Sequence, residues 1–208
     1  MTIDSTEDAL NLRHAEKMRK HQAARAKIMA GKTAEKGLII VHTGPGKGKT
    51  SAALGMVFRH IAHGLPVAVV QFTKAPDYVT GEAILLRRFP DLCTLEIMGD
   101  GFTWDTQDRA ADIASARAAW ERAKDLIRDD RHDLVLLDEL NIVLRYDYLP
   151  VAEIVDFLNA EKPPGKHVVI TGRNAKAELI ELADLVTEMA LVKHPFRAGV
   201  KAQKGIEF

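Results

Sequence analysis

Glycine and lysine residues follow an apolar run in residues 38–50, whose sequence is LIIVHTGPGKGKT. The glycines at 44, 46 and 48 let backbone N–H groups approach a phosphate closely, because side chains would block that approach. A helix expected to begin near Lys49 adds the positive end of its dipole. The segment therefore predicts a binding site for a polyphosphate.

The side chains of this loop suit the same chemistry. Lys49 supplies a mobile cation for the phosphates, and Thr50 supplies a hydroxyl ligand for Mg²⁺. The pattern departs from G-x-x-x-x-G-K-[ST] at its first position, because residue 43 is Thr. An ordinary glycine-rich turn is the alternative, but the flanking apolar and amphipathic segments favour a phosphate loop. The candidate phosphate-binding residues are Gly44, Pro45, Gly46, Lys47, Gly48, Lys49, Thr50 and Ser51.

A second apolar run, residues 134–137, leads into two carboxylates, Asp138 and Glu139. Mg²⁺ usually takes one or two carboxylates in addition to phosphate oxygens. Thr50, Asp138 and Glu139 are therefore the candidate metal site. In an ATPase, Glu139 would instead position a water molecule. A solvated strand end is the structural alternative.

Two aromatic residues, Phe102 and Trp104, lie in a glycine-flanked loop after an expected strand. Doubly wound folds bind ligands at this edge of the sheet. The two side chains can form a flat apolar surface for a ligand or pack into the core, and aromatic side chains usually pack inward. Arg173 follows another expected strand and is either a nucleotide contact or a surface arginine.

Short apolar runs alternate with helical patterns, which predicts an α/β fold with a doubly wound, mostly parallel sheet of the RecA-like phosphate-loop type. Several runs are apolar on successive residues, as expected when helices cover both faces. Trp120 lies on a helical apolar stripe and is expected in the core. Strands are expected at 38–43, 67–72, 94–98, 134–138, 167–171 and 185–191. Helices are expected at 49–63, after a cap at Asp105 or Thr106, at 150–158 and at 175–183.

Composition narrows the class of partner. The net charge is zero, so no global charge recruits nucleic acid or an anionic membrane surface. No apolar run approaches the roughly 18 residues of a membrane span. Cys93 is the only cysteine, so the chain has no internal disulfide. We expect a cytoplasmic protein that binds neither membranes nor nucleic acid.

Residues 1–36 differ from the rest, because they lack a strand signal and are rich in cations. They read as a solvated basic helix or a partly disordered arm. Residues 37–208 hold every strand signal and both phosphate-site motifs. We therefore expect a basic N-terminal helical arm, 1–36, followed by one phosphate-loop α/β domain, 37–208.

Several motifs, taken together and in this order, resemble the ATP:corrinoid adenosyltransferases of the bacterial cobalamin pathway. The resemblance covers roughly residues 37–208, and the shortened phosphate loop is itself typical of that family. The motifs are GPGKGKT (44–50), VQF (70–72), GFTW (101–104), LDEL (137–140), YDYLP (146–150), ITGR (170–173), VKH (192–194) and GVKAQ (199–203).

The resemblance implies transfer of the 5′-deoxyadenosyl group of ATP to the Co(I) of a reduced corrinoid, with release of triphosphate. It also implies a homodimer, and an electron donor such as a reduced flavoprotein. Cob(I)yrinic acid a,c-diamide, cobinamide and cobalamin all remain open as the corrinoid substrate, and so do biosynthesis and salvage as the pathway.

The resemblance also implies roles for particular residues. The phosphate loop would bind triphosphate, while Thr50 and Glu139 would hold Mg²⁺ with Asp138 nearby. Phe102 and Trp104 would lie under the corrin ring and displace its lower axial ligand, and the N-terminal arm would close over the corrinoid. Pro45 stands where many relatives carry Asn, and backbone binding by the loop is expected to survive that change. Lys49, Phe102, Trp104 and Glu139 are thus the candidate catalytic residues.

Two other functions remain open on the residues alone. The first is an ATP-hydrolysing RecA-like motor or phosphotransferase, in which Glu139 would orient water. The second is a nucleotide-gated binding module that uses the basic arm to grip a nucleic acid or protein partner. Corrinoid-independent ATP turnover would favour the first, and salt-sensitive binding without ATP chemistry would favour the second.

Overall fold

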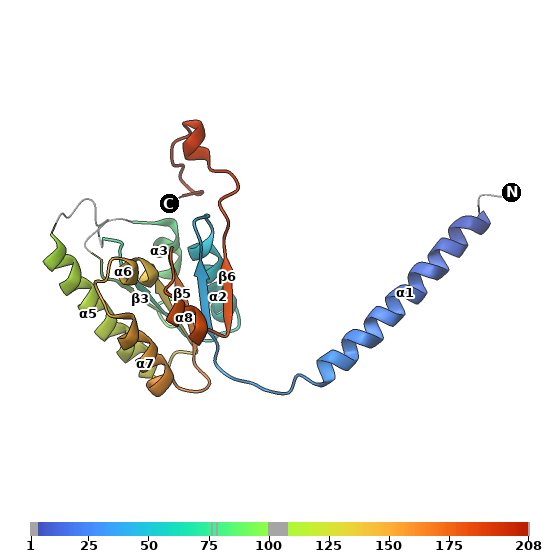
Figure 1. Ribbon diagram of the computed structural model, residues 1–208, viewed down its shortest axis with the longest axis horizontal. Helices are drawn as coiled ribbons and strands as arrows, with labels where there is room; N and C mark the ends of the chain where they lie inside the picture. The colour runs from blue at the N-terminus through green and yellow to red at the C-terminus, as the bar shows by residue number, and fades with distance from the viewer. Residues whose placement is uncertain (1–3, 76, 78, 100–107, 208) are drawn as a thin grey trace. The chain divides into compact units, whose positions relative to one another are not determined.

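A computed structural model describes residues 4–75, 77, 79–99 and 108–207 of the chain (Figure 1). The chain divides into two units, Met1–Glu35 and Lys36–Phe208. The first unit contains helix α1 (Asp4–Ala30), whose described side chains are exposed from residue 6 onward. Its large apolar residues, among them Leu10 and Ile28, are exposed and form no continuous stripe. The helix therefore lacks a face that would bury it against a core of its own.

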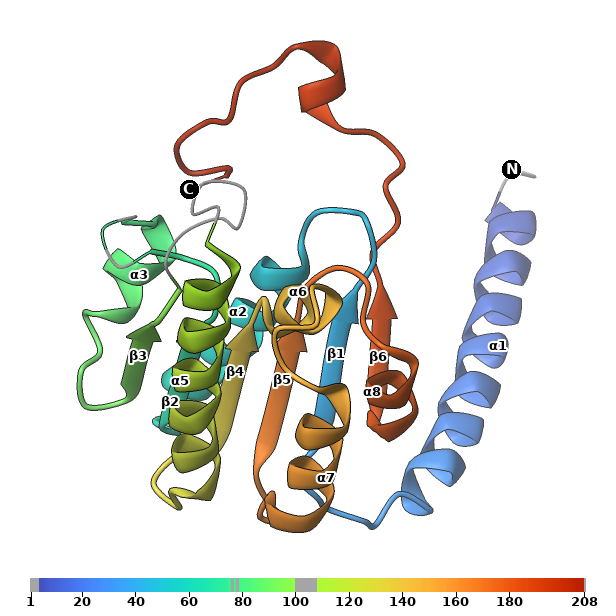
Figure 2. The ribbon, with the colours of Figure 1, turned by 60° about the vertical axis from the view of Figure 1, so that its left-hand side comes forward.

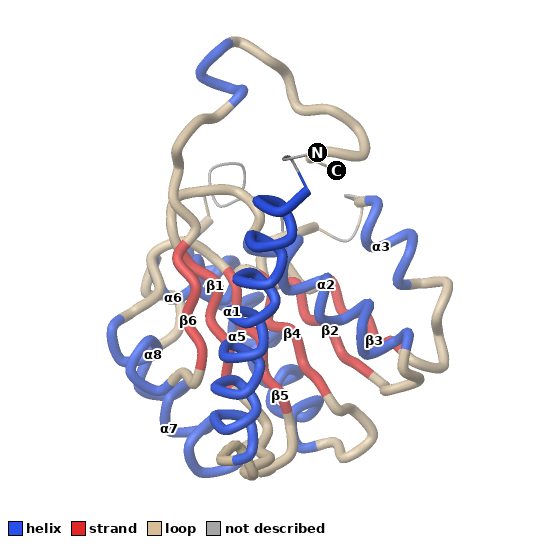
Figure 3. The backbone as a smooth tube through the Cα atoms, turned by 90° about the vertical axis from the view of Figure 1, so that its right-hand side faces the viewer, coloured by secondary structure: helices blue, strands red, loops and turns tan. Residues whose placement is uncertain are grey.

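The second unit is built on a sheet in which, among the described residues, six strands run parallel. Figure 2 shows the strands side by side in the order β3-β2-β4-β5-β1-β6, and Figure 3 draws the same strands in red. Their bounds are β1 (Ile39–Thr43), β2 (Val67–Gln71), β3 (Cys93–Ile97), β4 (Leu134–Asp138), β5 (His167–Thr171) and β6 (Leu185–Glu188). Since all strands point the same way, their carboxyl ends meet at one edge of the sheet.

The strand order brings the glycine-rich motif and the acidic motif close to each other. Strand β5 lies between β1, which leads into the glycine-lysine loop, and β4, which ends at Asp138. Within β1, β2 and β4 every residue is buried, because helices cover both faces of the sheet. Strand β6 is an edge strand and is exposed along its length.

Helices pack on the two faces of the sheet in two separate apolar clusters. One cluster joins α2 (Lys49–Ala62) and α3 (Gly81–Leu86) to the sheet through residues that include Val57 and Leu86. The other joins four helices through residues that include Trp120 and Phe157. These helices are α5 (Arg109–Arg128), α6 (Leu140–Arg145), α7 (Val151–Glu161) and α8 (Ala177–Leu182).

The predicted fold is confirmed, with differences at the ends of elements. All the expected strands are present, although β6 ends at Glu188 instead of extending to residue 191. Trp120 is fully buried, as its helical stripe predicts. The cap of α5 is Asp108, whose carboxylate accepts hydrogen bonds from the N–H groups of Ala110 and Ala111. Helices α3 and α6 and a short 3₁₀ turn, η1 (Pro195–Ala198), were not predicted, because they are too short to show a period.

Candidate active site

The glycine-lysine loop turns from β1 into α2 through backbone conformations that favour glycine. Gly44 has a φ of 96° and Gly48, which caps α2, has a φ of 106°. A side chain at either position would be strained, because L-residues rarely adopt a positive φ. The N-terminal N–H groups of α2 therefore follow directly on a tight, side-chain-poor turn, which is the arrangement that anion sites use.

Lys49 is buried within this loop. The residue is only 6% exposed. Its ammonium donates hydrogen bonds to the carbonyl oxygens of Gly44 (3.0 Å) and Gly46 (2.5 Å). Burial lowers the pKa of Lys49, while Glu139 raises it in part. The ammonium thus lies at the centre of the loop, held by groups that carry no formal charge.

The loop also packs tightly against the residues that follow the edge strand β6. The N–H of Gly46 donates to the carbonyl of Met189 at 2.7 Å. A Cβ on Gly44 would lie 2.6 Å from that carbonyl oxygen, and a Cβ on Gly46 would lie 2.5 Å from the carbonyl oxygen of Ala190. Both contacts are too close for any side chain, so the loop and the end of β6 require each other's backbone shape.

Asp138 is the centre of a polar network at the carboxyl ends of three strands and the start of α2. Its Oδ1 accepts hydrogen bonds from the hydroxyls of Thr50 and Thr171, both at 2.8 Å. Its Oδ2 accepts from the amide of Gln71 at 3.2 Å and lies 3.5 Å from the ammonium of Lys74. Asp138 is 1% exposed, and this full set of partners makes such burial of a carboxylate tolerable.

The neighbouring carboxylate, Glu139, has a very different environment. Its backbone adopts a left-handed φ of 64°, and its N–H donates to the hydroxyl of Thr171 at 2.9 Å. Its Oε2 is buried and lacks a hydrogen-bond partner in the described part of the chain. Burial, followed by the charge of Asp138, raises the pKa of Glu139 to about 7, although nearby cations oppose the shift.

Comparison with known proteins identifies the family of the chain. A family model described as ATP:corrinoid adenosyltransferase BtuR/CobO/CobP matches residues 35–208. The chain belongs to this family. It is 65% identical over 197 residues to a corrinoid adenosyltransferase of Sinorhizobium sp, covering 94% of this chain and 92% of the relative.

Two further relatives agree. A corrinoid adenosyltransferase of Pseudomonas aeruginosa is 50% identical over 196 residues, which are 94% of this chain and 96% of the relative. One of Escherichia coli K12 is 49% identical over 174 residues, with coverages of 84% and 87%. As a member of the ATP:corrinoid adenosyltransferases, the chain is an enzyme with ATP and a corrinoid as substrates. Neither ATP hydrolysis by a motor nor a nucleotide-gated binding module is favoured.

Among the residues predicted for the adenosyltransferase site, those that the structure describes lie at one edge of the sheet. Arg173 is exposed, but its charge acts on both Lys49 and Glu139. Pro45 and Ser51 are exposed on the loop and on the first turn of α2. Lys47 forms an ion pair with Glu207 of the C-terminal tail. Figure 2 shows this tail leaving β6 and turning back above the carboxyl edge. Phe102 and Trp104 lie outside the described residues.

The residues around Asp138 and Glu139 fit a magnesium ion. Buried Oε2 of Glu139 is an acceptor without a partner, and the Thr50 hydroxyl, by donating to Asp138, keeps its lone pairs free for a cation. Oxygen ligands of this kind are those that Mg²⁺ prefers, with phosphate oxygens completing the shell. Asp138 has partners on both oxygens, so it is suited to orient Thr50 more than to bind the ion directly.

Several residues of this network were not singled out from the sequence. Gln71, Lys74 and Thr171 all contact Asp138. Each lies at or just after the carboxyl end of a strand, and that position in a parallel sheet is the signal that would have found them. The described chain offers no cluster of three or more His, Cys, Asp or Glu side chains that would hold a metal. Nor does any described helix combine the length and apolarity that crossing a bilayer requires.

Proposed function

We propose that this enzyme transfers the 5′-deoxyadenosyl group of ATP to the cobalt of a reduced corrinoid and releases triphosphate. The observation that carries the proposal is the meeting of the Lys49 loop with Asp138 and Glu139 in a member of this family. The electron pair of Co(I) forms the Co–C bond at C5′. The C5′–O bond breaks, and its electron pair leaves with the triphosphate. Cobalt is thereby formally oxidised to Co(III).

The loop is assigned to the leaving group. Backbone N–H groups at the start of α2, with Lys47, Lys49, Ser51 and Arg173, would bind the triphosphate. Charge that develops on it as the C5′–O bond breaks is stabilised most by donors already fixed in place. Lys49 meets that condition, since its ammonium is held by the carbonyls of Gly44 and Gly46. Both carbonyls belong to the loop that would surround the phosphates.

Thr50 and Glu139 would hold Mg²⁺, with Asp138 orienting the Thr50 hydroxyl. When bound, the ion would neutralise part of the charge on the triphosphate. No proton has to be removed from either substrate, so a general base is not required. Glu139 is accordingly assigned to the metal and not to water activation.

The corrinoid side of the reaction rests on other residues. Phe102 and Trp104 would provide a dry aromatic platform under the corrin ring, which favours four-coordinate cobalt and eases its reduction. The basic arm, residues 1–36, would close over the corrinoid bound to the domain formed by residues 37–208. A homodimer, a reduced flavoprotein as electron donor and a cytoplasmic location complete the proposal.

The test is an anaerobic assay with ATP, Mg²⁺ and chemically reduced corrinoid. We expect one triphosphate for each light-sensitive Co–C product formed, and no reaction when the corrinoid is omitted. Formation of ADP and phosphate at a rate equal to ATP consumption would overturn the proposal. Running cobyrinic acid a,c-diamide, cobinamide and cobalamin in parallel would identify the preferred corrinoid.

A further inference from the structure

Lys74 lies just beyond the carboxyl end of β2, at the same edge of the sheet as the phosphate loop. Its side chain is only 16% exposed. The ammonium lies 2.7 Å from Oε1 of Glu82, in the first turn of α3, and 3.5 Å from Oδ2 of Asp138, at the end of β4. An almost buried cation thus bridges two carboxylates from two different elements.

This bridge continues into the phosphate loop. Asp138 accepts the hydroxyl of Thr50 on the oxygen that Lys74 does not contact. An unbroken chain of polar contacts therefore runs from α3 to the first turn of α2, through Glu82, Lys74, Asp138 and Thr50. Among the described residues, Lys74 is the only cation that forms an ion pair with Asp138.

The surroundings of Lys74 favour its protonated form. Burial opposes it, but the carboxylates of Asp138 and Glu82 outweigh burial and raise the pKa of Lys74. The two acids at the end of β4 need such a cation, because adjacent carboxylates with little access to water repel each other. Lys74 supplies it on the side of Asp138 and leaves Oε2 of Glu139 unpartnered.

The backbone of Lys74 has a second constraint. Its carbonyl accepts the N–H of Gly99 at 3.1 Å, and a Cβ on Gly99 would lie 2.4 Å from the backbone of Thr73. The main chain at Lys74 is therefore fixed against the segment after β3, while its side chain is fixed between two acids. A lysine held at both ends is suited to set the geometry of its partners.

We propose that Lys74 is a positioning residue for adenosyl transfer. Its ammonium pairs with Oδ2 of Asp138 and offsets the charge of that carboxylate. Asp138 then orients the Thr50 hydroxyl through Oδ1 and does not add its own charge to the metal site. Glu82 fixes the side chain of Lys74 and offsets part of the positive charge that Lys74 presents to Asp138. The inference rests on the proposed roles of Thr50 and Glu139 in holding Mg²⁺, and it assigns a function to two residues, Lys74 and Glu82, that lie outside that pair.

The test compares Lys74→Met with wild-type enzyme in two measurements. The first is Mn²⁺ affinity of the complex with a non-hydrolysable ATP analogue, followed by electron paramagnetic resonance without corrinoid. The second is kcat for adenosyl transfer at saturating metal. We expect Mn²⁺ to bind about tenfold more tightly, because one nearby positive charge is removed. We expect kcat to fall about tenfold or more, because Thr50 loses its orientation.

Further variants separate positioning from a structural role. Lys74→Arg keeps the charge and should restore Mn²⁺ affinity to about wild type. Glu82→Gln leaves the whole charge of Lys74 beside Asp138, so Mn²⁺ should bind a few-fold more weakly, opposite in sign to Lys74→Met. Lys124→Met is the matched control, since Lys124 is 17% exposed and pairs with Glu121 at 2.8 Å on α5. It should change neither measurement.

Opposite shifts of metal affinity and kcat in Lys74→Met support the inference. Unchanged or weaker Mn²⁺ binding in that variant, or a kcat that stays near wild type, would overturn it. If Lys74→Met does not fold, the sign of the shift in Glu82→Gln decides, and tighter or unchanged binding there overturns it. Failure of wild-type enzyme to release triphosphate would instead refute the proposed reaction, because the metal measurement uses no corrinoid.

Discussion

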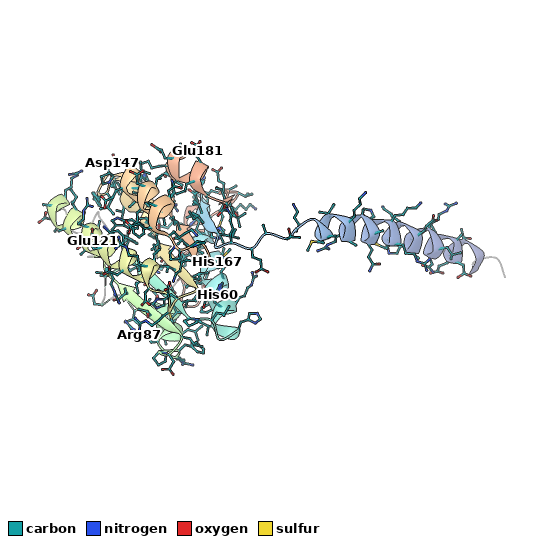
Figure 4. The ribbon with its side chains drawn as sticks, turned by 90° about the horizontal axis from the view of Figure 1, so that it is seen from below. His60, Arg87, Glu121, Asp147, His167 and Glu181 are labelled. Carbon is teal, nitrogen blue, oxygen red and sulfur yellow. The ribbon has the colours of Figure 1, made fainter. Side chains whose placement is uncertain are left out.

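Buried or half-buried lysines occur at both edges of the sheet, and their partners differ. Figure 4 shows the domain from below, with His167, the first residue of β5, labelled. At this amino edge Lys166 is 4% exposed and donates to the carbonyls of Asp129 and His132. Lys162 donates to three carbonyls, those of Gly37, Pro163 and Lys166 itself, at 2.9–3.1 Å. These two ammonium groups join the loops that precede β1, β4 and β5.

At the carboxyl edge the same type of side chain contacts groups of the proposed substrate site. Lys49 contacts the carbonyls of its own loop, and Lys74 contacts two carboxylates. Burial lowers the pKa of Lys162 and Lys166, whereas the acids beside Lys74 raise its pKa despite burial. The lysines of the amino edge join loops through backbone carbonyls, whereas Lys74 is bound by carboxylates. Lys49 shares carbonyl partners and a pKa lowered by burial with the amino edge, and it differs in lying within the loop proposed to bind phosphate.

The largest expected effect is that of Lys49→Ala. Loss of the loop cation should lower kcat/KM for ATP about 1000-fold, because one fixed donor to developing charge is removed. The melting temperature should fall as well, because the buried carbonyls of Gly44 and Gly46 lose their donor, but by less than the loss of activity would require. Steady-state kinetics and thermal unfolding measure both. A large loss of stability with modest loss of activity would show that Lys49, like Lys162 and Lys166, mainly fixes the fold.

Glu139→Gln should have the next largest effect. An amide keeps the shape of the side chain but is a weaker ligand for Mg²⁺, so we expect kcat to fall about 100-fold and the Mg²⁺ requirement to rise. Titrating activity with Mg²⁺ at fixed ATP measures the change. Glu153→Gln, which removes an acid paired with Arg117 on the helical layer, is the control and should be silent. Equal effects of the two variants would contradict the assignment of Glu139.

Lys166→Met should reverse the pattern at the other edge. One buried and one half-buried carbonyl would lose their charged donor, which costs about 2 kcal/mol of unfolding free energy. Because these carbonyls precede β4 and so lie at the opposite edge of the sheet from the phosphate loop, KM for ATP and kcat should stay within about twofold of wild type. Denaturant unfolding and kinetics test this. A selective loss of activity would show that the amino edge also contributes to the reaction.

The smallest expected effect concerns pH and His132, at the amino edge. Its ring is buried, and its Nε2 lies 3.0 Å from the Thr94 hydroxyl. Burial lowers the pKa of His132 below its ordinary value of 6.5, although Asp129 opposes the shift. A histidine with a lowered pKa stabilises the fold above about pH 6.5 and loses that contribution as pH falls through the folded-state pKa.

Unfolding free energies measured from about pH 7.5 to about pH 5 test this prediction. The stability of wild-type protein should decline more steeply across this range than that of His132→Gln. His63→Gln, which removes an exposed histidine, is the control and should follow wild type. Parallel curves for wild type and His132→Gln would show that the ring does not titrate in this range.

Much of the fold was readable from the sequence because the signals are local. Each buried strand is a short apolar run, and the glycines of the phosphate loop are close in the chain to the strand and helix that flank them. Asp138 and Glu139 were identified by the same logic, since they end such a run. The family resemblance added the reaction and was confirmed by the comparisons.

The contacts within the site were not readable, because they depend on strand order. Thr171 reaches Asp138 only because β5 pairs with β4, and Lys74 reaches it only because β2 pairs with β4 on the other side. The ion pair between Lys47 and Glu207 joins residues 160 positions apart, and no local pattern indicates that the tail returns to the loop. Short helices such as α6 were not predicted for a different reason: one or two turns are too short to show a helical period.

The left-handed backbone of Glu139 has a consequence for how this position would evolve. A glycine there would relieve roughly 1 kcal/mol of strain and remove a buried oxygen that has no protein partner. A lineage selected only for endurance at high temperature should therefore drift toward glycine at residue 139. If Glu139 holds Mg²⁺ as proposed, laboratory evolution for heat tolerance without corrinoid demand should replace this acid early.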